Sequence, residues 1–550
     1  MNKLKHIENF IQRQSDIKIL TSFSYNSELK GLIEGSITIE VEPSIILNFE
    51  VSIYPLYPFQ FQNVESISFK NPELLEYGHI MKDGSICIHT THSVSLEEKL
   101  GYDFNSLRLW IKEYYINSRN SSSKYEHIIT PLALFEDCYY SLCFNNIEKD
   151  FLKGEFGLIS LSEVRSGIYN EKRIRNFYLQ SFNNISGKEL HNVEWNPKIK
   201  SLSKNEGIYV YIENIPAEYG KFSLKKWDQL HPYLSKSFIE TLHYWEKNIF
   251  GKGEIVPLIV GYKIPNGELH WELIILKAGD FPLYGVKDST KKWNTEIDGD
   301  RTIKWGKTHN ISYDYFFGRG KLNDRLTEGK ILLLGIGAVG SMIANTLVRG
   351  GCKNICIIDF DTKYPENVCR SEYTLNPLVC SKIEDLRGLL YDISPYVHIP
   401  ALDIELKLLF QNTPEKIREF EEIFNSYDFV FDCTTDNDLL YLISKLNLTS
   451  DLFSFSISNK ADHLVCACDG NRYLFSRTQF NNVLKYNTED LYEPTGCWSP
   501  TFKASYNDIN LLVQTAIKHI NLKLEKNIAI GNFVVETEFE DNLKIALNEF

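Results

Sequence analysis

A glycine-rich turn between an apolar strand and a helix constrains the fold of this chain more than any other feature. Ile331–Leu334 is a short apolar run of the kind that forms a buried parallel strand, and the helix is expected to begin near Ser341. Glycines at such a turn let the backbone approach a phosphate group, and the amino terminus of the helix favours its negative charge. The glycines with G-x-G-x-x-G spacing are Gly335, Gly337 and Gly340.

An acidic residue follows this turn at a distance typical of nucleotide-binding units. Asp359 lies 19 residues after Gly340, at the end of the next predicted strand, where a carboxylate can hold a ribose hydroxyl. Taken alone, this pattern is weak, because it fits a nicotinamide-binding domain nearly as well as an ATP-binding one.

The 550 residues are too many for one core, and we divide them into three regions. The last alternates apolar strands with helices, which predicts a mainly parallel, Rossmann-like α/β sheet. The first reads as α+β: Gly35–Tyr54 alternates with period two, as an antiparallel meander does, and helices are expected near Ser106–Ser118 and Ile128–Lys149. The middle region reads as α/β and contains no motif that we can assign. The regions are 1–150, 151–310 and 311–550.

Composition excludes several classes of function. There are 59 basic against 72 acidic residues, a net charge of −13, which argues against a general nucleic-acid binder. No apolar run approaches the roughly 18 residues of a membrane span, and the amino terminus lacks the apolar run of a secretion signal, so a cytoplasmic protein is expected. The 11 cysteines include no C-x-x-C pair, so they are expected to be thiols and no structural zinc is expected.

A set of polar residues after Asp359 distinguishes an ATP-binding domain from a nicotinamide-binding one. It closely resembles the motifs of the ThiF/MoeB/ubiquitin-activating superfamily, and the resemblance covers roughly Leu322–Lys523. The last member lies in the strand-like run DFVFDCTTDND. The set is Asp361, Asn367, Arg370, Lys382 and Asp432.

This resemblance implies an adenylating enzyme that uses ATP and magnesium. Asp359 would bind the ribose, and Asp432 would bind magnesium. The chemistry needs such groups independently, because a carboxylate that attacks the α-phosphate builds negative charge that cations and a metal ligand stabilise. The residues implied to hold the phosphates are Asn367, Arg370 and Lys382.

The same family often inserts an arginine from the segment before the glycine turn, sometimes from a partner subunit. Arg319 and Arg325 are the candidates here. An ordinary solvated role for either residue stays open.

Cys497, in EPTGCWSPTF, is the first candidate nucleophile. Its loop precedes a helix expected after Thr501, and a thiol just before a helix amino terminus can have a lowered pKa. The position matches the thioester cysteine of bacterial activating enzymes with a G-C-x-x-P-T-F signature. Cys433, Cys466 and Cys468 read as structural residues of strands.

Cys87 is the second candidate nucleophile. A Y-P-x-Y-P turn, a G-x-I-C-I loop and a tryptophan on a following helix, Trp110, resemble the ubiquitin-conjugating fold over about residues 20–145. Conjugating enzymes usually have H-P-N before the cysteine, and here the stretch is Tyr77–His79. His79 is a candidate substitute for the asparagine. His89 and His92 are candidates for a base or for donors to the oxyanion.

One chain with a conjugating-type, a middle and an activating-type domain resembles the fused conjugating–activating proteins of bacterial antiphage CBASS operons. That family joins the carboxyl terminus of a cGAS-like nucleotidyltransferase (CD-NTase) to target amines. The resemblance implies adenylation of the partner's terminal carboxylate, a thioester on Cys497, exchange to Cys87 and transfer to an amine, such as that of a lysine. A homodimer is expected by analogy alone.

Three alternatives stay open. The first is an adenylating enzyme for sulfur transfer or peptide modification, whose amino-terminal domain only binds substrate. The second is a nicotinamide-dependent oxidoreductase. The third is a scaffold without enzymatic activity.

Overall fold

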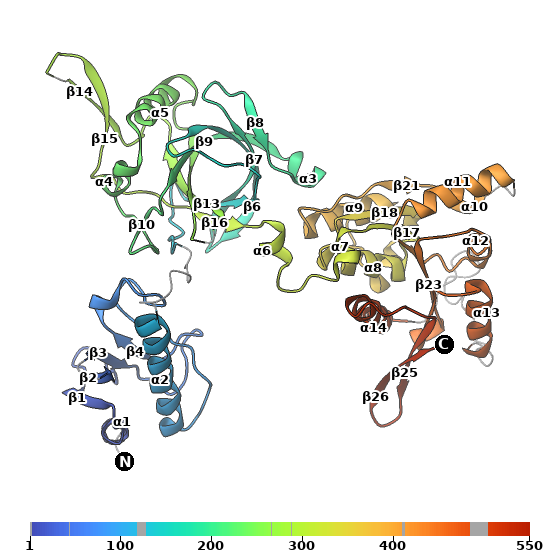
Figure 1. Ribbon diagram of the computed structural model, residues 1–550, viewed down its shortest axis with the longest axis horizontal. Coiled ribbons are helices and arrows are strands. Elements are labelled where there is room, and N and C mark those ends of the chain that lie inside the picture. The colour runs from blue at the N-terminus through green and yellow to red at the C-terminus, as the bar shows by residue number, and fades with distance from the viewer. Residues whose placement is uncertain are drawn as a thin grey trace.

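The computed structural model describes residues 3–42, 45–117, 128–265, 267–287, 289–409, 413–483 and 504–550. Its helices and strands fall into three parts, coloured blue, green to yellow, and yellow to red along the chain (Figure 1). We call them the amino-terminal, middle and carboxyl-terminal parts. Where the chain is described, every helix is too short or too polar to cross a membrane.

The amino-terminal part is an antiparallel four-stranded sheet with two helices. Its strands follow the chain order β1-β2-β3-β4, so the predicted meander is confirmed. Phe49 and Phe69 of the sheet and Phe104 and Trp110 of the long helix share one apolar core. The elements are α1 (Lys3–Gln12), β1 (Ile17–Tyr25), β2 (Ile33–Glu42), β3 (Ile45–Ile53), β4 (Ile67–Lys70) and α2 (Leu96–Trp110), which continues as a π-helical turn, Ile111–Ile116.

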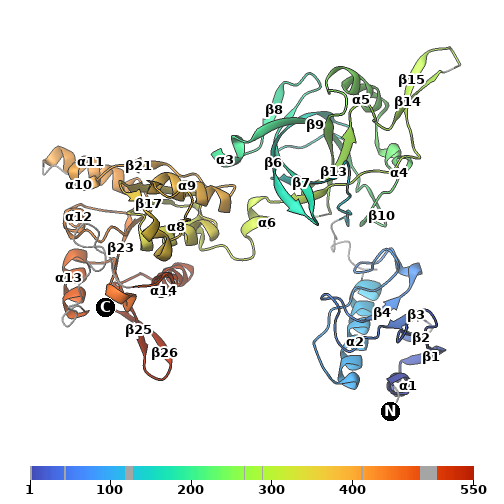
Figure 2. The same ribbon diagram turned by 180° about the vertical axis from the view of Figure 1, so that it is seen from behind.

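The middle part is built on one eight-stranded mixed sheet of order β13-β12-β9-β6-β7-β5-β16, with β8 beside β7. Its two end strands are linked by the segment before β16: the Gly306 N–H donates to the Leu273 carbonyl (2.8 Å), and β16 pairs with β5. The sheet therefore curves strongly (Figure 2). Its strands are β5 (Cys138–Phe144), β6 (Phe156–Tyr169), β7 (Lys172–Asn183), β8 (Glu189–Asn192), β9 (Ser203–Glu213), β12 (Ile255–Lys263), β13 (Leu269–Lys277) and β16 (Lys307–Asn310).

Short helices and two small hairpins complete the middle part. Phe238, Leu242 and Trp245 of its longest helix pack on one face of the curved sheet, while Tyr140, Tyr209 and Trp271 fill the other. The elements are α3 (Pro197–Lys200), α4 (Trp227–Leu230), α5 (Lys236–Asn248), β10 (Ala217–Glu218), β11 (Phe222–Ser223), β14 (Leu283–Lys287) and β15 (Trp293–Ile297).

The expected helix over Ile128–Lys149 is wrong, because this stretch contains strand β5. Its sequence, CYYSLCF, is rich in aromatic side chains, which fit a pleated and half-buried surface. β5 pairs in parallel with β7, so it belongs to the sheet of the middle part. The division that we propose near residue 150 therefore cuts the chain after the first strand of that sheet.

The carboxyl-terminal part holds an eight-stranded sheet of order β21-β18-β17-β22-β23-β24-β25-β26. The first five strands of this order are parallel and the last three antiparallel. Its strands are β17 (Lys330–Leu334), β18 (Asn354–Asp359), β21 (Ala401–Asp403), β22 (Phe429–Asp432), β23 (Asp451–Ile457), β24 (His463–Ala467), β25 (Phe533–Phe539) and β26 (Leu543–Glu549); β19 (Thr362–Lys363) and β20 (Cys380–Ser381) pair separately.

Helices cover both faces of this sheet, so the Rossmann-like α/β expectation is confirmed. α8, α9 and α14 pack on one face, and α11 and α12 on the other. The helices are α6 (Tyr313–Phe317), α7 (Asp324–Glu328), α8 (Ala338–Arg349), α9 (Lys382–Ile393), α10 (Leu406–Leu409), α11 (Pro414–Asn425), α12 (Asn437–Ile443), α13 (Arg472–Val483) and α14 (Tyr506–Glu525).

Candidate nucleotide site and candidate thiol site

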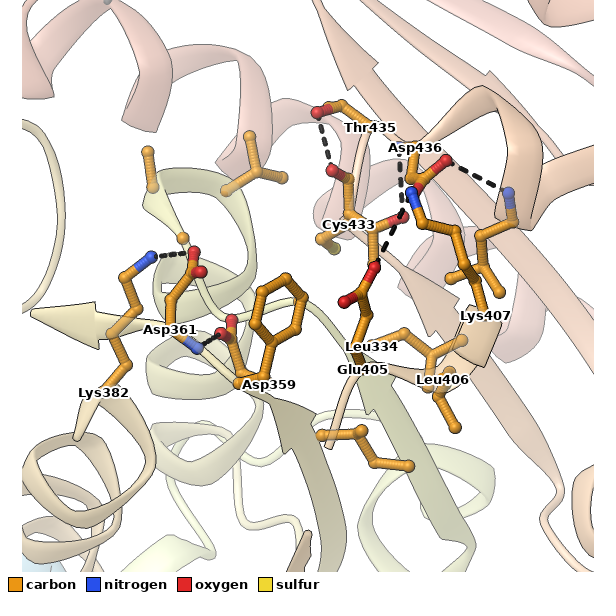
Figure 3. A pocket seen from close by; sticks show the side chains of 18 of the residues that line it. Leu334, Asp359, Asp361, Lys382, Glu405, Leu406, Lys407, Cys433, Thr435 and Asp436 are labelled. Carbon is orange, nitrogen blue, oxygen red and sulfur yellow. Dashed lines mark hydrogen bonds and ion pairs between the residues drawn. The ribbon is translucent and has the colours of Figure 1, made fainter. Parts of the chain in front are cut away.

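A cavity of about 360 Å³ opens at the carboxyl ends of β17, β18 and β22. Parallel sheets bind ligands at this edge, because the loops that follow neighbouring strands meet there. The cavity is lined from both sides of the glycine turn, with acidic and basic side chains facing one another (Figure 3). Lining residues with polar side chains include Asp359, Asp361, Asn367, Arg370, Lys382 and Asp436.

The glycine turn is sterically required at two positions. Gly335 has a φ of +73°, and a Cβ there would lie 2.9 Å from the Cα of Thr434. A Cβ on Gly340 would lie 2.0 Å from the Gly335 carbonyl oxygen. Gly337 caps α8 and has open space where a Cβ would stand. The helix begins at Ala338, three residues before the expected start, and points free N–H groups at the cavity.

The two acids after β18 are fixed at one wall of the cavity. The Asp359 carboxylate accepts hydrogen bonds from the N–H groups of Ile336 and Asp361, both at 2.7 Å. It thereby ties the glycine turn to the end of the strand. The Lys382 ammonium forms an ion pair with Asp361 at 2.6 Å, and the two side chains meet in Figure 3. Asn367 and Arg370 reach the cavity from the 3₁₀ turn Pro365–Arg370.

Asp432, the expected magnesium ligand, lies beneath the cavity and is 2% exposed. One carboxylate oxygen accepts the Thr434 hydroxyl at 2.7 Å, and the other accepts the Ser454 hydroxyl at 2.9 Å. Burial raises the pKa of Asp432 above its ordinary value, against these hydrogen bonds. The residue therefore organises the turn after β22 and does not line the cavity.

Asp436 lines the cavity four residues later, and our sequence analysis did not single it out. It caps α12 by accepting the N–H groups of Asp438 and Leu439, and its other oxygen pairs with Lys407 Nζ at 2.8 Å. Burial acts to raise the pKa of Asp436, but Lys407 and the cap outweigh it and the pKa lies below its usual range. A sequence signal existed, since an aspartate directly before a helical run is a typical cap.

Two further cavity residues also escaped the sequence analysis. Glu405 and Lys407 precede and enter the short α10, and their side chains face Asp436. Lys407 Nζ lies 3.8 Å from Glu405 and 2.8 Å from Asp436. Nothing in their local sequence marks them, because only the chain's return to the sheet edge brings them here.

Neither candidate arginine lines this cavity. Arg325 pairs with Asp451 at 2.9 Å and lies over the Phe429 ring at 5.2 Å, at the amino ends of β22 and β23. That is the opposite edge of the parallel strands. Arg319 is exposed in the turn after α6.

The cysteines divide into buried and accessible ones. Cys433 and Cys466 are buried in the core of the carboxyl-terminal part, and burial raises their pKa well above the usual range. Cys468 is half-buried. Cys497 lies outside the described residues, so its expected role stays a prediction.

Cys87 lies half-buried at the wall of a second cavity, of about 1030 Å³. Its Sγ is 3.5 Å from Nε2 of His89, and its N–H donates to the His79 carbonyl at 2.8 Å. The sequence-predicted thiol and one of its three candidate histidines are therefore in contact. The lining is largely apolar and includes Leu56, Phe61 and Met81.

The other two histidines are placed differently. His79 has a positive φ of +51°, and its ring packs 4.6 Å from the ring of Tyr114. Its stretch is held by Trp110, whose indole N–H donates to the Gly78 carbonyl at 2.9 Å. The His92 ring lies 6.2 Å from that of Phe59. His79 thus supports the Cys87 loop through its backbone carbonyl.

Comparison with known proteins agrees with this geometry. Residues 310–452 match the ThiF family, so the carboxyl-terminal part carries a ThiF-family domain, as the motifs indicated. The chain is also similar to the ATP-dependent ubiquitin transferase-like protein Cap2 of Enterobacter hormaechei subsp. hoffmannii (strain UCI 50). The two are 26% identical over 244 residues, which are 42% of this chain and 39% of that protein. The resemblance inferred from the sequence is thereby confirmed.

Two further similarities are found. An adenylyltransferase and sulfurtransferase UBA4 of Lodderomyces elongisporus is 31% identical over 131 residues, 23% of this chain and 26% of that protein. A crystal structure of E. coli MccB with ATP aligns with 41% of this chain and 65% of its own, at 15% identity and a TM-score of 0.29. The chain thus spans less than half the length of Cap2 and less than half the length of UBA4.

Proposed function

We propose that the chain adenylates a carboxylate with ATP through the cavity of its ThiF-family domain. The observation that carries this proposal is the meeting of three groups at one sheet edge: the glycine turn, the Asp359 carboxylate and the cationic side chains of Arg370 and Lys382. A dinucleotide site needs the first two groups. Cations at the same cavity favour a reaction in which phosphate charge grows.

Each group has a defined task in this proposal. Asp359 accepts hydrogen bonds from the ribose hydroxyls, and the N–H groups at the start of α8 donate to phosphate oxygens. Asn367 donates to the phosphates from the 3₁₀ turn. Arg370 and Lys382 stabilise the charge that develops as the carboxylate attacks the α-phosphate, and Lys382 exchanges Asp361 for a phosphate oxygen as its partner.

Asp436 and Glu405 are carboxylates at the cavity of the kind that hold magnesium, and a bound ion would replace Lys407 as the partner of Asp436. This ion keeps several waters and is held by one or two carboxylates together with substrate phosphates. Within the described ranges, no group of three or more His, Cys, Asp and Glu side chains is placed to hold a metal. A magnesium site of this kind does not need such a group. Asp436 would hold the ion at the cavity, and Asp432 is the alternative. When bound, magnesium neutralises charge on the phosphates.

We further propose that the adenylate is captured as a thioester on Cys497, passed to Cys87 and transferred to an amine. The support is the resemblance to conjugating enzymes and the position of Cys87 at a cavity wall. The acyl donor in this proposal is a protein with a free carboxyl terminus, of the CD-NTase class, within an antiphage CBASS system. The proposed assembly is a homodimer, and joining the domains raises the effective concentration of each cysteine for the other.

The test is incubation with ATP and magnesium in extract of the native host, followed by gels with and without reductant and by mass spectrometry. Wild type is compared with Cys87→Ala and Cys497→Ala, and with Cys369→Ala, which removes an exposed cysteine, as the control. We expect a reductant-sensitive adduct that needs Cys497 to form and Cys87 to move on.

Other results would favour the alternatives. Modified product that forms normally in Cys87→Ala would support sulfur transfer or peptide modification, because the proposed relay needs Cys87 after the adenylate has formed. Tight binding of a dinucleotide and indifference to Lys382→Ala would support an oxidoreductase. An unshifted band in all variants, with no pyrophosphate released, would leave a scaffold.

A further inference from the structure

A buried ionic cluster lies under the loop that carries Cys87. The Lys99 ammonium is 1% exposed and donates to Glu65 at 2.7 Å and to Asp103 at 2.5 Å. Lysine is rarely buried unless it is paired in this way. We call this group the Lys99 cluster; its members are Tyr57, Glu65, Thr90, Lys99 and Asp103.

The cluster joins segments that are distant in the sequence. Tyr57 comes from the turn after β3, Glu65 from the approach to β4, Thr90 from the loop after Cys87, and Lys99 and Asp103 from α2. The Tyr57 hydroxyl donates to Asp103 at 2.8 Å across 46 residues. Tyr57, Glu65, Lys99 and Asp103 are buried and Thr90 is half-buried, so moving one of these polar groups would leave buried partners unsatisfied.

One ammonium shared by two carboxylates leaves the cluster short of positive charge, and the two acids respond differently. Burial acts to raise the pKa of Glu65, but hydrogen bonds from Lys99 and Gln60 outweigh it, and the pKa lies below its usual range. Burial dominates at Asp103 and raises its pKa above the usual range. Asp103 therefore depends most on its remaining donors, the hydroxyls of Thr90 and Tyr57.

Thr90 anchors the loop after Cys87 to the Lys99 cluster. Its oxygen accepts from Lys99 Nζ at 2.5 Å and lies 2.6 Å from Asp103, to which its hydroxyl donates. Its backbone N–H donates to Glu65 at 3.2 Å. Side chain and main chain are thus both anchored, so the peptide unit that joins Thr90 to His89 has a fixed orientation.

His89 stands between two such anchors. On one side, the Cys87 N–H is bonded to the His79 carbonyl at 2.8 Å; on the other, Thr90 is held by the cluster. His89 itself is exposed, so packing does not hold its ring. Its contact with the thiol, 3.5 Å from Nε2 to Sγ, depends on where the backbone places it.

We propose that the Lys99 cluster is a positioning device that fixes the loop after Cys87 and so holds His89 against the thiol. The inference rests on the proposed role of Cys87 as acyl acceptor. In that exchange, the thiol proton passes to Nε2 of His89 and the sulfur bonds to the carbonyl carbon of the incoming thioester. The donor's C–S bond breaks, and the donor sulfur leaves with the proton returned from His89.

The test is the rate at which iodoacetamide alkylates Cys87 in the full chain, followed by mass spectrometry of its peptide. Thr90→Val deletes the hydroxyl and keeps the shape, and Thr90→Ser keeps the hydroxyl. We expect Thr90→Val to slow alkylation by about tenfold, the effect of one unit in thiol pKa, and Thr90→Ser to restore it. Thr91→Val, at the exposed neighbouring position, is the control and is expected to match wild type.

A double-mutant cycle separates positioning from general loosening. Because the cluster acts through His89, Thr90→Val should have no further effect once His89→Gln has been made. Equal slowing in both backgrounds, or a wild-type rate for Thr90→Val, would overturn the inference. Should Thr90→Val not fold, Tyr57→Phe removes one hydroxyl from the same cluster and goes through the same cycle.

This test and the test of the proposed function fail in different ways. Alkylation needs neither ATP nor an acyl donor. An additive cycle with normal adduct transfer would reject the positioning device and leave the relay intact. A coupled cycle with no adduct on Cys87 would reject the relay and keep the device.

Discussion

The two candidate sites differ in where their charged groups lie. In the ThiF-family domain, backbone N–H groups, a glycine turn and accessible charges line a cavity at a sheet edge. In the amino-terminal part, the thiol lies on a largely apolar wall to which Glu65 and Asp83 also contribute, and Lys99 and Asp103 are enclosed in the Lys99 cluster. The first site presents its charges to a ligand, whereas the second uses them to hold a loop.

Under the proposed function, this difference follows from what each site would recognise. A phosphate chain carries charge that cations and helix N–H groups can meet directly. A thioester carries none, so a site for it needs a placed sulfur and a placed proton acceptor. Four predictions test this contrast. They are ordered from the largest expected change in free energy to the smallest.

The largest effect is expected at Lys99. Lys99→Met leaves two buried carboxylates without their cation, which should cost about 3–5 kcal/mol. Hydrogen exchange of the α2 amides in a urea series measures the opening free energy of this part. Lys112→Met, at an exposed position, is the control. A loss below about 1 kcal/mol at Lys99 would show that the charges do not hold this part together.

Next comes Gly340 in the nucleotide site. In Gly340→Ala the new Cβ meets the Gly335 carbonyl, so the turn must shift. A displacement of about 1 Å can cost roughly 100-fold in rate, and we expect at least that loss in pyrophosphate release. Gly388→Ala, in the middle of α9 with open space around the Cβ, should keep full activity. Unchanged release from Gly340→Ala would contradict the assignment of this turn to the phosphates.

A smaller effect distinguishes the two aspartates after β22. Asp436→Asn keeps a residue that caps α12 but removes the charge at the cavity, so ATP affinity in magnesium should fall by about tenfold. Calorimetric titration with ATP at several magnesium concentrations measures it. Asp432→Asn should leave the magnesium dependence unchanged, since the carboxylate is enclosed. The reverse pattern would return the metal to Asp432.

The smallest effect concerns a partly exposed ion pair. Arg108 donates to both oxygens of Asp16 at 2.7 and 2.8 Å, and this hydrogen bonding holds the pKa of Asp16 below its usual range. The ionised form therefore stabilises the fold above the unfolded-state pKa of about 3.9. That contribution is lost as pH falls through the lower folded-state pKa.

Asp16→Asn should accordingly destabilise the amino-terminal part by less than about 1 kcal/mol at pH 7. The difference from wild type should begin to shrink below about pH 4 and vanish once the pH is below the folded-state pKa of Asp16, as measured by the α2 exchange assay. Glu28→Gln, at an exposed position, is the control. A difference that grew toward acid pH would contradict this sign.

Local rules made much of the ThiF-family domain readable from the sequence. Gly335 and Gly340 were predictable because a short strand-to-helix turn has few allowed backbone shapes. Asp359 followed from its distance after that turn. The place of Asp436 at the cavity was not predicted, because DCTTDND offers three aspartates. Only the turn after β22 decides which of them is enclosed.

Contacts across long separations were beyond sequence reasoning. β5 was expected to be helical, since its apolar residues fit either period and its parallel partner β7 decided the outcome. Glu65, 34 residues before Lys99, carried no signal of an ion pair. Lys407 reached the nucleotide cavity only through the return of the chain to the sheet edge.

By itself, then, the sequence determined the class of the carboxyl-terminal domain and its glycine turn, and it predicted the acid that follows that turn and two candidate thiols. The tertiary structure decided which aspartate faces the cavity, which histidine meets Cys87 and where the buried lysine finds its partners. The physical reason is the distance along the chain over which each feature is decided. Backbone shape and strand pattern are set by neighbours in the chain, whereas the enclosure of a charge depends on every element that packs around it.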